Sequence, residues 1–306
     1  MKDTQIVVSI VCIAYNVEKY IAEAIESVLM QKVNFKYELV IGEDCSTDST
    51  LEIALRYQKQ HPDKIVVLQR EKNLGLTPNC VDTHNHCRGK YIALLDGDDY
   101  WTDVNKLQKQ VDILEANPQY AGCAHQSLII KGDHTKPVRL FGAETDAILT
   151  LNDTITHRKF HTSALVYRKE IWDKCGGIPP QISSNERAIY PMVAIFGNIY
   201  YLKDNMCVYR LAPTGLNSKI SCTELEKDLA MLPWLKQIDK NFPINKFKAF
   251  LHLCMFSYPR KTPFLPLTKH YLLSIFFSFS YFPKNLGDAK WWTINYFKKL
   301  KRLCGR

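Results

Sequence analysis

Apolar and polar positions follow two alternating periods over the first hundred residues. Ile6–Ala14 is a continuous run of apolar, mostly β-branched residues, which is typical of a strand buried on both faces. Ile21, Ile25, Val28 and Leu29 then recur at helical spacing and predict an amphipathic helix. The alternation continues, with strands predicted over 37–42, 65–69 and 91–95 and helices over roughly 48–60 and 77–87. Strands that alternate with helices of this length are typical of βαβ units and a parallel sheet.

The rest of the chain has a more mixed pattern. Apolar residues on one face predict a helix over Asp103–Ala116, which ends before Pro118. Short strands are predicted over 123–130, 164–168, 199–202 and 206–210, with a helix near 186–196. Beyond about residue 215 the strand signals fade and the chain is predicted to be helical. We therefore expect an α/β domain over residues 1–215 and a helical, basic, aromatic region over 216–306.

Composition and charge narrow the class of protein. The chain has 306 residues, 46% hydrophobic and 23% charged, which is typical of a folded globular protein and not of a disordered one. No two of the ten cysteines form a C-x-x-C pair, and no cleavage site follows the N-terminal residues, so we expect a cytosolic protein with reduced thiols. Residues 245–306 contain twelve Lys or Arg and one acidic residue, so the net charge of this segment is +11. The net charge of the whole chain is +9, so the residues before 245 carry −2.

An acidic turn follows the last predicted strand of the first hundred residues. Ligands of parallel α/β sheets bind beyond the carboxyl ends of the strands, and here that position reads Asp96-Gly97-Asp98-Asp99. Three carboxylates so close together repel one another unless a cation or donors offset them. Their oxygens suit Mg²⁺ or Mn²⁺, either of which would bridge to a diphosphate. The alternative is a solvated acidic turn, since Asp-Gly is a common hairpin signal.

A second polar cluster follows the strand over 37–42. It reads Glu43-Asp44-Cys45-Ser46-Thr47-Asp48 and leads into a helix, so part of it is expected to cap that helix. Asp44 comes before the cap, where its carboxylate could accept a hydrogen bond from a nucleotide base.

The order of these segments resembles the family 2 glycosyltransferases. The resemblance rests on VSIVCIAYN, AIESVLMQ, YELVIGEDCSTDST, NLGLTPN and GKYIALLDGDDYW followed by KLQKQ, and it covers about the first 110 residues. It implies the GT-A fold, an α/β nucleotide-binding domain with a mostly parallel central sheet, and transfer with inversion at the anomeric carbon. It also implies a nucleotide-sugar site that contains Tyr15, Asn16, Glu43, Asp44, Asn73, Asp96 and Asp98. Within that site, Asp44 would bind the base, Asp96 would lie by the ribose, and Asp98 would bind the metal together with Asp96.

Inversion requires a general base that takes the proton of the acceptor hydroxyl. The family usually supplies an Asp at the start of a late helix, and the matching position here is Glu186. The alternative is that Glu186 is a solvent-facing residue favoured at a helix start by the helix dipole. In that case Asp173 is the reserve candidate for the base. Relatives often have a His two residues beyond Tyr209-Arg210, near the phosphates or the acceptor, and Ala212 stands there in this sequence, so a phosphate contact made by a His is not expected at that position. His161 is a candidate for the acceptor side or for a structural role.

Other sequence patterns argue against several further classes of protein. His84 and His86 are two apart in a predicted helix and so do not share a face, which argues against zinc. The sequence lacks G-x-G-x-x-G and a Walker loop, which argues against a dinucleotide oxidoreductase and a P-loop kinase. Trp292, Tyr296, Leu300 and Leu303, interleaved with lysines, predict a basic amphipathic helix that fits an anionic membrane better than nucleic acid. The alternative is that these apolar residues cover the catalytic domain and the lysines are solvated.

We therefore expect an enzyme that moves a sugar, with a UDP-sugar as the favoured donor, to a hydroxyl of a glycan or lipid-linked acceptor in cell-surface polysaccharide synthesis. It would act in the cytoplasm, peripherally on the inner face of the membrane. Two rivals remain. One is a nucleotidyltransferase with the same metal site, and the other is a non-catalytic GT-A-like membrane adaptor.

Overall fold

The computed structural model describes residues 5–132, 137–156, 158–211, 221–257 and 264–278. The chain divides into two compact units, and each is described by itself. The first unit comprises residues 1–154, 158–180 and 185–213, and the second comprises residues 155–157, 181–184 and 214–306.

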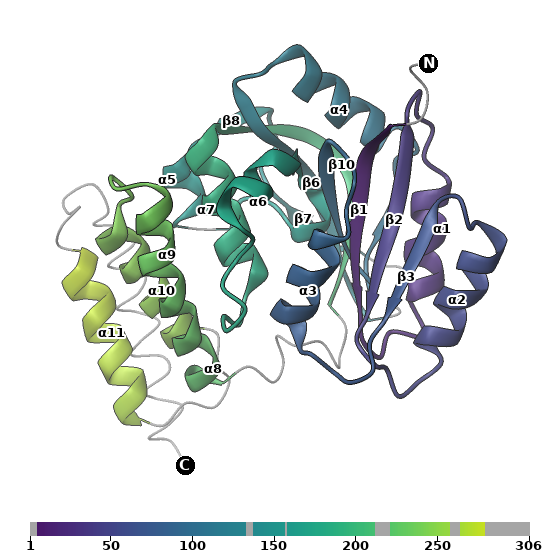
Figure 1. The fold of residues 1–306 in the computed structure, drawn as a ribbon. Helices are drawn as coiled ribbons and strands as arrows, with labels where there is room; N and C mark the ends of the chain where they lie inside the picture. The colour runs from purple at the N-terminus through teal and green to yellow at the C-terminus, as the bar shows by residue number, and fades with distance from the viewer. Residues whose placement is uncertain (1–4, 133–136, 157, 212–220, 258–263, 279–306) are drawn as a thin grey trace. The chain divides into compact units, whose positions relative to one another are not determined.

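The first unit alternates strands and helices up to residue 96 and is more mixed after it (Figure 1). Its elements are, in order, β1 (Ile6–Ala14), α1 (Ile21–Leu29), β2 (Lys36–Glu43), α2 (Thr50–Gln60), β3 (Ile65–Gln69), α3 (Leu76–Asn85), β4 (Tyr91–Asp96), β5 (Tyr100–Trp101), α4 (Lys106–Ala116), β6 (Tyr120–Lys131), β7 (Pro137–Phe141), β8 (Ala147–Leu149), α5 (Leu151–Thr154), the 3₁₀ helix η1 (Thr162–Ala164), β9 (Val166–Arg168), α6 (Lys169–Cys175), α7 (Asn185–Phe196) and β10 (Asn198–Leu211).

One sheet of ten strands runs through this unit. Its order is β3-β2-β1-β4-β9-β6-β10-β5, with β7 beside β6 and β8 beside β10. The first four strands pair in parallel, as the βαβ pattern predicts, whereas β9 and β5 join antiparallel to their neighbours. β1, β2 and β4 are almost wholly buried, which explains why their sequences are mostly apolar. The buried polar exceptions, Ser9 of β1 and Glu38 of β2, pair with each other, since Ser9 Oγ donates to Glu38 Oε1 at 2.6 Å.

The register of the parallel strands brings the polar clusters to one edge. Ala14 of β1 lies opposite Glu43 of β2, and Ile13 of β1 lies opposite Asp96 of β4. The chain turns sharply after β4, where the Gly97 N–H donates to the Ile13 carbonyl at 3.1 Å. A Cβ on Gly97 would lie 2.9 Å from that same carbonyl oxygen, so only glycine fits this turn. The acidic turn is therefore held close to β1.

Some predicted boundaries are wrong. The two strands predicted over 199–202 and 206–210 form the single strand β10, whose register against β6 shifts on both sides of Asn205. The strand predicted over 164–168 is only three residues long, because η1 occupies its first part. The helix predicted from Asp103 begins at Lys106. The nine described cysteines are all free thiols, and seven of them are buried.

The second unit is helical. Its helices are α8 (Cys222–Glu226), the 3₁₀ helix η3 (Lys227–Ala230), α9 (Met231–Ile238), α10 (Ile244–Ser257) and α11 (Phe264–Ser278). α10 and α11 pack through an apolar cluster that contains Leu253, Phe256, Leu267 and Tyr271. In the described part of the chain, no helix combines the length and the apolar character needed to span a membrane. The amphipathic helix predicted around Trp292 lies outside the described residues.

Candidate active site

The loops after β1 and β2 form one wall of the candidate site. Asn16 has a left-handed backbone (φ 53°), and its side-chain oxygen accepts a hydrogen bond from the Thr47 N–H at 2.8 Å. Tyr15 is 46% exposed, which leaves its ring available to a ligand. Glu43 is buried, and its Oε1 accepts from the Ser46 N–H at 2.9 Å, while its Oε2 has no hydrogen-bond partner among the described residues. An unpaired buried carboxylate oxygen is costly and is typical of a position that a ligand completes.

Asp44 connects this wall to the loop that contains Asn73. The Asp44 carboxylate accepts hydrogen bonds from the N–H groups of Leu74 (2.7 Å) and Gly75 (3.0 Å), and the Asn73 amide donates to the Asp44 carbonyl at 3.0 Å. Burial raises the pKa of Asp44, and the two backbone amides oppose that shift. Asp44 thus orders the 73–75 loop, and each of its oxygens keeps a lone pair for a further donor.

The acidic turn places three carboxyl groups at the end of β4. Burial is the main cause that raises the pKa of each of the three. For Asp96 the neighbouring charges of Asp98 and Glu186 add to burial and raise the pKa to about 7, while Arg158 opposes the shift. Among the described residues, no N–H or O–H group donates a hydrogen bond to the Asp96 side chain. Clustered, undercompensated carboxylates of this kind favour a bound cation.

Asp99 differs from its neighbours because it is a structural anchor. It is 1% exposed, and it accepts hydrogen bonds from Ser163 Oγ at 2.7 Å and from the Arg210 N–H at 2.9 Å. It thereby fastens the turn to η1 and to β10. Arg210 completes the connection through its guanidinium, which donates to the Asp98 carbonyl and pairs with Glu23 at 2.6 Å.

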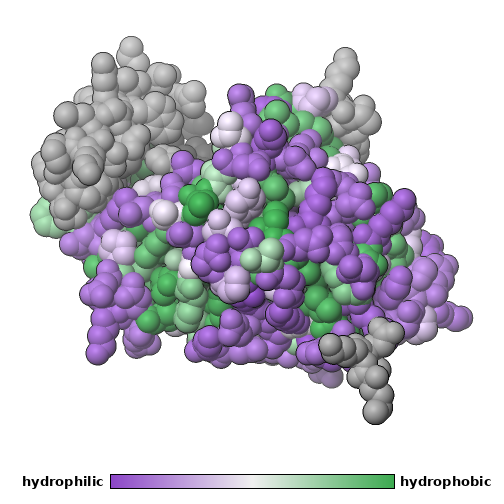
Figure 2. Space-filling model, turned by 90° about the horizontal axis from the view of Figure 1, so that it is seen from above, coloured by the Kyte–Doolittle hydropathy of each residue, from purple (hydrophilic) through white to green (hydrophobic). Residues whose placement is uncertain are grey.

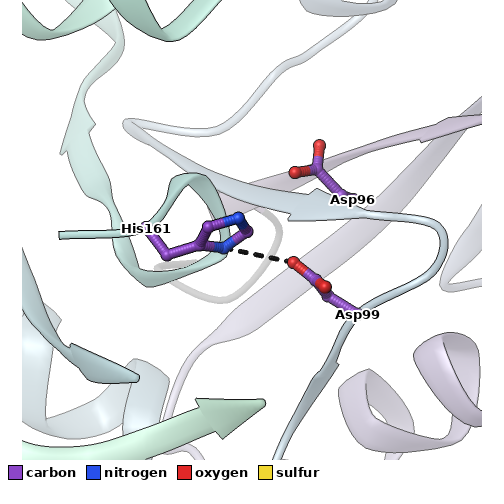
Figure 3. Close-up of side chains that lie close together, drawn as sticks. All are labelled: Asp96, Asp99 and His161. Carbon is purple, nitrogen blue, oxygen red and sulfur yellow. Dashed lines mark ion pairs between the residues drawn. The ribbon is translucent and has the colours of Figure 1, made fainter. Parts of the chain in front are cut away.

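His161 brings a ring nitrogen close to this group. Its Nδ1 lies 3.2 Å from Asp99 Oδ2, and ligand atoms of Asp96, Asp99 and His161 all lie within 4.8 Å of one another (Figure 3). Burial lowers the pKa of His161 and raises that of Asp99, so both shifts favour the uncharged forms. The carboxyl oxygens of Asp96 and Asp99 are ligands that suit Mn²⁺ or Mg²⁺, whereas an imidazole is more typical of softer divalent metals. The predicted ligand Asp98 is not one of these three, but it lies between two of them in the turn.

Glu186 lies at the start of α7, as predicted, and is paired with a residue that the sequence did not indicate. Arg158 Nη1 lies 2.9 Å from Glu186 Oε1, and Thr162 Oγ1 donates to Oε2 at 3.3 Å. The Arg158 guanidinium also lies over the rings of Phe141 and Tyr209 at 5.2 and 5.6 Å. Thr162 and Ser163 are neighbours in η1, and Ser163 donates to Asp99, so the Glu186–Arg158 pair lies beside the acidic turn.

The other candidates lie elsewhere. Asp173, the reserve base, is on α6, where it pairs with Lys169 at 2.6 Å and is 55% exposed. His84 is buried and stacks on Trp172 at 4.0 Å, whereas the His86 side chain is 50% exposed. Ala212 lies outside the described residues.

A buried lysine, Lys106, contacts Trp101 and Gln110, which hydrogen-bond to carbonyl groups of η1. Trp101 Nε1 donates to the Ser163 carbonyl at 2.9 Å, and the Lys106 ammonium lies 4.0 Å from the centre of the Trp101 ring. Lys106 Nζ donates to Gln110 Oε1, and the Gln110 amide donates to the carbonyls of Cys123 and Ala164. Burial lowers the pKa of Lys106 to about 7.

Lys106→Met is expected to change how stability depends on pH. Between pH 7 and 10 a lysine in the unfolded chain is protonated, whereas Lys106 in the folded protein is not, so unfolding takes up a proton. Protons become scarcer as the pH rises, so the contribution of Lys106 to the free energy of unfolding increases with pH. The free energy of unfolding of the wild type should therefore rise relative to that of Lys106→Met between pH 7 and 9 in urea titrations. Lys59→Met, at an exposed position, should give a constant difference. A constant difference for Lys106→Met as well would show that this amine is charged in the folded protein.

Comparison with solved structures identifies the class of fold. The structure of S. aureus TarS in complex with UDP-GlcNAc matches with a TM-score of 0.68 at 19% identity, over 88% of this chain and 79% of that chain. A mannosyltransferase of Pyrobaculum calidifontis in complex with GDP-Man and Mn²⁺ matches with a TM-score of 0.60 at 17% identity, over 98% of this chain and 88% of that chain. The predicted GT-A fold is confirmed.

Sequence comparison gives the family. Residues 9–177 match the model of glycosyl transferase family 2, so the chain belongs to that family, as its motifs predicted. An uncharacterized protein of Mycobacterium tuberculosis is 33% identical over 208 residues, which are 68% of this chain and 60% of that protein. The chain thus matches about 60% of the length of this relative.

Proposed function

We propose that this protein is an inverting glycosyltransferase that moves a sugar from a nucleoside diphosphate donor to an acceptor hydroxyl. The observation that carries the proposal is the group of carboxylates at the end of β4, where burial raises the pKa of Asp96, Asp98 and Asp99. A divalent cation held by Asp96 and Asp98 would offset this charge. When bound, the cation would neutralise charge on the diphosphate leaving group.

The wall formed after β1 and β2 would hold the nucleoside. Tyr15 would pack against the base, and Asp44 would accept a hydrogen bond from it with a lone pair that the Leu74 and Gly75 amides leave free. Asn16, Glu43 and Asn73 would border the same pocket. A UDP-sugar is the donor we favour, and the UDP-GlcNAc bound to TarS supports this choice, while the GDP-Man complex makes GDP-sugars the first alternative.

Glu186 would act as the general base. Its carboxylate would accept the proton of the acceptor O–H as that oxygen forms a bond to the anomeric carbon. The bond between the anomeric carbon and the diphosphate oxygen would break, and the nucleoside diphosphate would leave with the electron pair. Arg158 would orient Glu186 through their ion pair, since a base must be held within hydrogen-bond reach of the proton it takes.

The proposal also covers the acceptor and the place in the cell where the protein acts. The acceptor would be a glycan or lipid-linked hydroxyl in cell-surface polysaccharide synthesis. Residues 1–215 would form the catalytic domain, and the basic region over 216–306 would contact the cytoplasmic face of a membrane. The excess of lysine and arginine after residue 244 supports this setting.

A donor panel tests the proposal. The purified full chain would be incubated with UDP-, GDP- and dTDP-sugars and Mn²⁺, with and without a chelator, and the released nucleoside diphosphate measured. We expect release from one class of donor that stops when the chelator is added. Pyrophosphate release from a nucleoside triphosphate would favour a nucleotidyltransferase, and no release from any donor would favour an adaptor.

A further inference from the structure

The surface of α11 that faces away from α10 has an unusual composition. Leu265, Lys269, Leu272 and Phe276 follow one another at spacings of four, three and four residues and so form one stripe along the helix, here named the outer face of α11. Leu265 is 77% exposed, Leu272 58% and Phe276 66%. The opposite side of α11, which includes Leu267 and Tyr271, packs in the cluster with α10.

No other described element exposes three large apolar side chains. The three most exposed large hydrophobic residues of the described chain are all on the outer face of α11. The others are less exposed and come from several different elements, as expected of a protein surface on which apolar side chains reach solvent in small patches (Figure 2). A row of three on one helix is instead typical of an interaction surface.

The charges of α10 and α11 indicate the kind of partner. Neither α10 nor α11 contains an Asp or a Glu, and their only charged residues with a fixed sign are Lys246, Lys248 and Lys269. Lys269 belongs to the stripe, and its side chain is 60% exposed although it also pairs with Glu226. The sequence over 245–306 carries +11. An apolar stripe in a strongly basic segment is complementary to an anionic lipid surface.

We propose that the outer face of α11 is a membrane-docking surface, which inserts Leu265, Leu272 and Phe276 among the headgroups of a bilayer that contains anionic phospholipid. This rests on the proposed action at a membrane and names the surface responsible for it. A helix that lies in the interface buries its apolar side among the headgroups and acyl chains while lysines meet the phosphates. α11 contributes such a side, and the backbone polar groups in the interior of a helix pair within it.

Vesicle binding by the full chain tests the surface. Wild type, Leu272→Glu/Phe276→Glu and the control Ile148→Glu would be sedimented with vesicles of phosphatidylcholine alone or with about 30% phosphatidylglycerol. Ile148 is 52% exposed on β8, so the control places the same charge at a comparably exposed apolar position of the first unit. We expect wild type and control to bind the anionic vesicles, and the double variant to bind about a hundredfold more weakly, roughly tenfold for each buried side chain.

Parallel measurements keep the result interpretable. Melting temperatures would show that the double variant is folded, and nucleotide release from a soluble donor should equal that of the wild type. Equal vesicle binding by wild type and double variant would overturn the proposal. So would a wild type that does not bind vesicles, or a change from dimer to monomer in the double variant, which would make a second copy the partner. Vesicle binding without nucleotide release would leave the surface in place and reject only the proposed enzyme activity.

Discussion

Replacing Glu186 by glutamine is expected to lower the turnover number for sugar transfer by about 10²- to 10⁴-fold, because the amide cannot take the acceptor proton. Gln has the same shape, and its oxygen can still accept a hydrogen bond from Arg158 or Thr162, so the fold should persist. The loss should fall on kcat while the dissociation constant of the donor stays nearly unchanged, since the residue would act on the acceptor. Steady-state rates with a saturating donor and calorimetric donor binding would measure both quantities.

Two variants control this experiment. Glu170→Gln changes an exposed glutamate of α6 that pairs with Lys174, and it should leave the rate unaltered. Asp173→Asn tests the reserve base at the exposed end of the same helix. A normal rate for Glu186→Gln together with a large loss for Asp173→Asn would transfer the role of base to Asp173. A normal rate for both would point to a base from another part of the chain.

Asp98→Asn is expected to have opposite effects on stability and activity. The substitution removes one of three mutually repelling carboxylates whose charged form is disfavoured by burial, so the metal-free protein should melt at a higher temperature. Activity should fall by at least about 100-fold, because several kcal/mol of charge stabilisation in the transition state would be lost with the cation. The rise in melting temperature that Mn²⁺ gives the wild type should also shrink or disappear.

Asp99→Asn provides the contrast within the same turn. Asp99 accepts hydrogen bonds from Ser163 Oγ and the Arg210 N–H and contacts His161, so an amide there would misplace a donor in a buried network. A loss of about 1–3 kcal/mol in the free energy of unfolding is expected. If Mn²⁺ stabilises Asp98→Asn as much as the wild type, Asp98 does not bind the cation. Stabilisation that is lost only in Asp99→Asn would favour the group of Asp96, Asp99 and His161.

Most of the first half of the fold could be predicted from sequence. β1, β2 and β4 are almost wholly buried, so their sequences are mostly apolar up to the edge of the sheet, although β2 also contains the buried Glu38, which pairs with Arg88. β10 could not be predicted as one strand, because Lys203, Asp204 and Asn205 interrupt the apolar pattern where its register against β6 shifts. β9 has only three residues, which is too short for any periodicity to define.

The candidate site was only partly predictable, for a geometric reason. Carboxyl ends of parallel strands meet at one edge, so the clusters around Asp44 and Asp96 were expected there. Within the acidic turn, however, Asp98 and Asp99 are chemically identical, and only the position of β10 makes Asp99 the anchor. Arg158 lies in an irregular segment before η1, where no repeating pattern marks a residue as functional.

The anchor at Asp99 also constrains how the protein can fold during synthesis. Asp99 and Arg210 are separated by 111 positions, and β10 pairs with both β6 and β5. A nascent chain that has emerged only as far as α6 therefore has its acidic turn but not the strand that secures it. Bringing two residues so far apart in sequence together costs conformational entropy, and contacts of this kind form slowly. Until β10 arrives, the three aspartates of a growing polypeptide would remain hydrated, and a fragment released before that point should be unable to assemble the pocket.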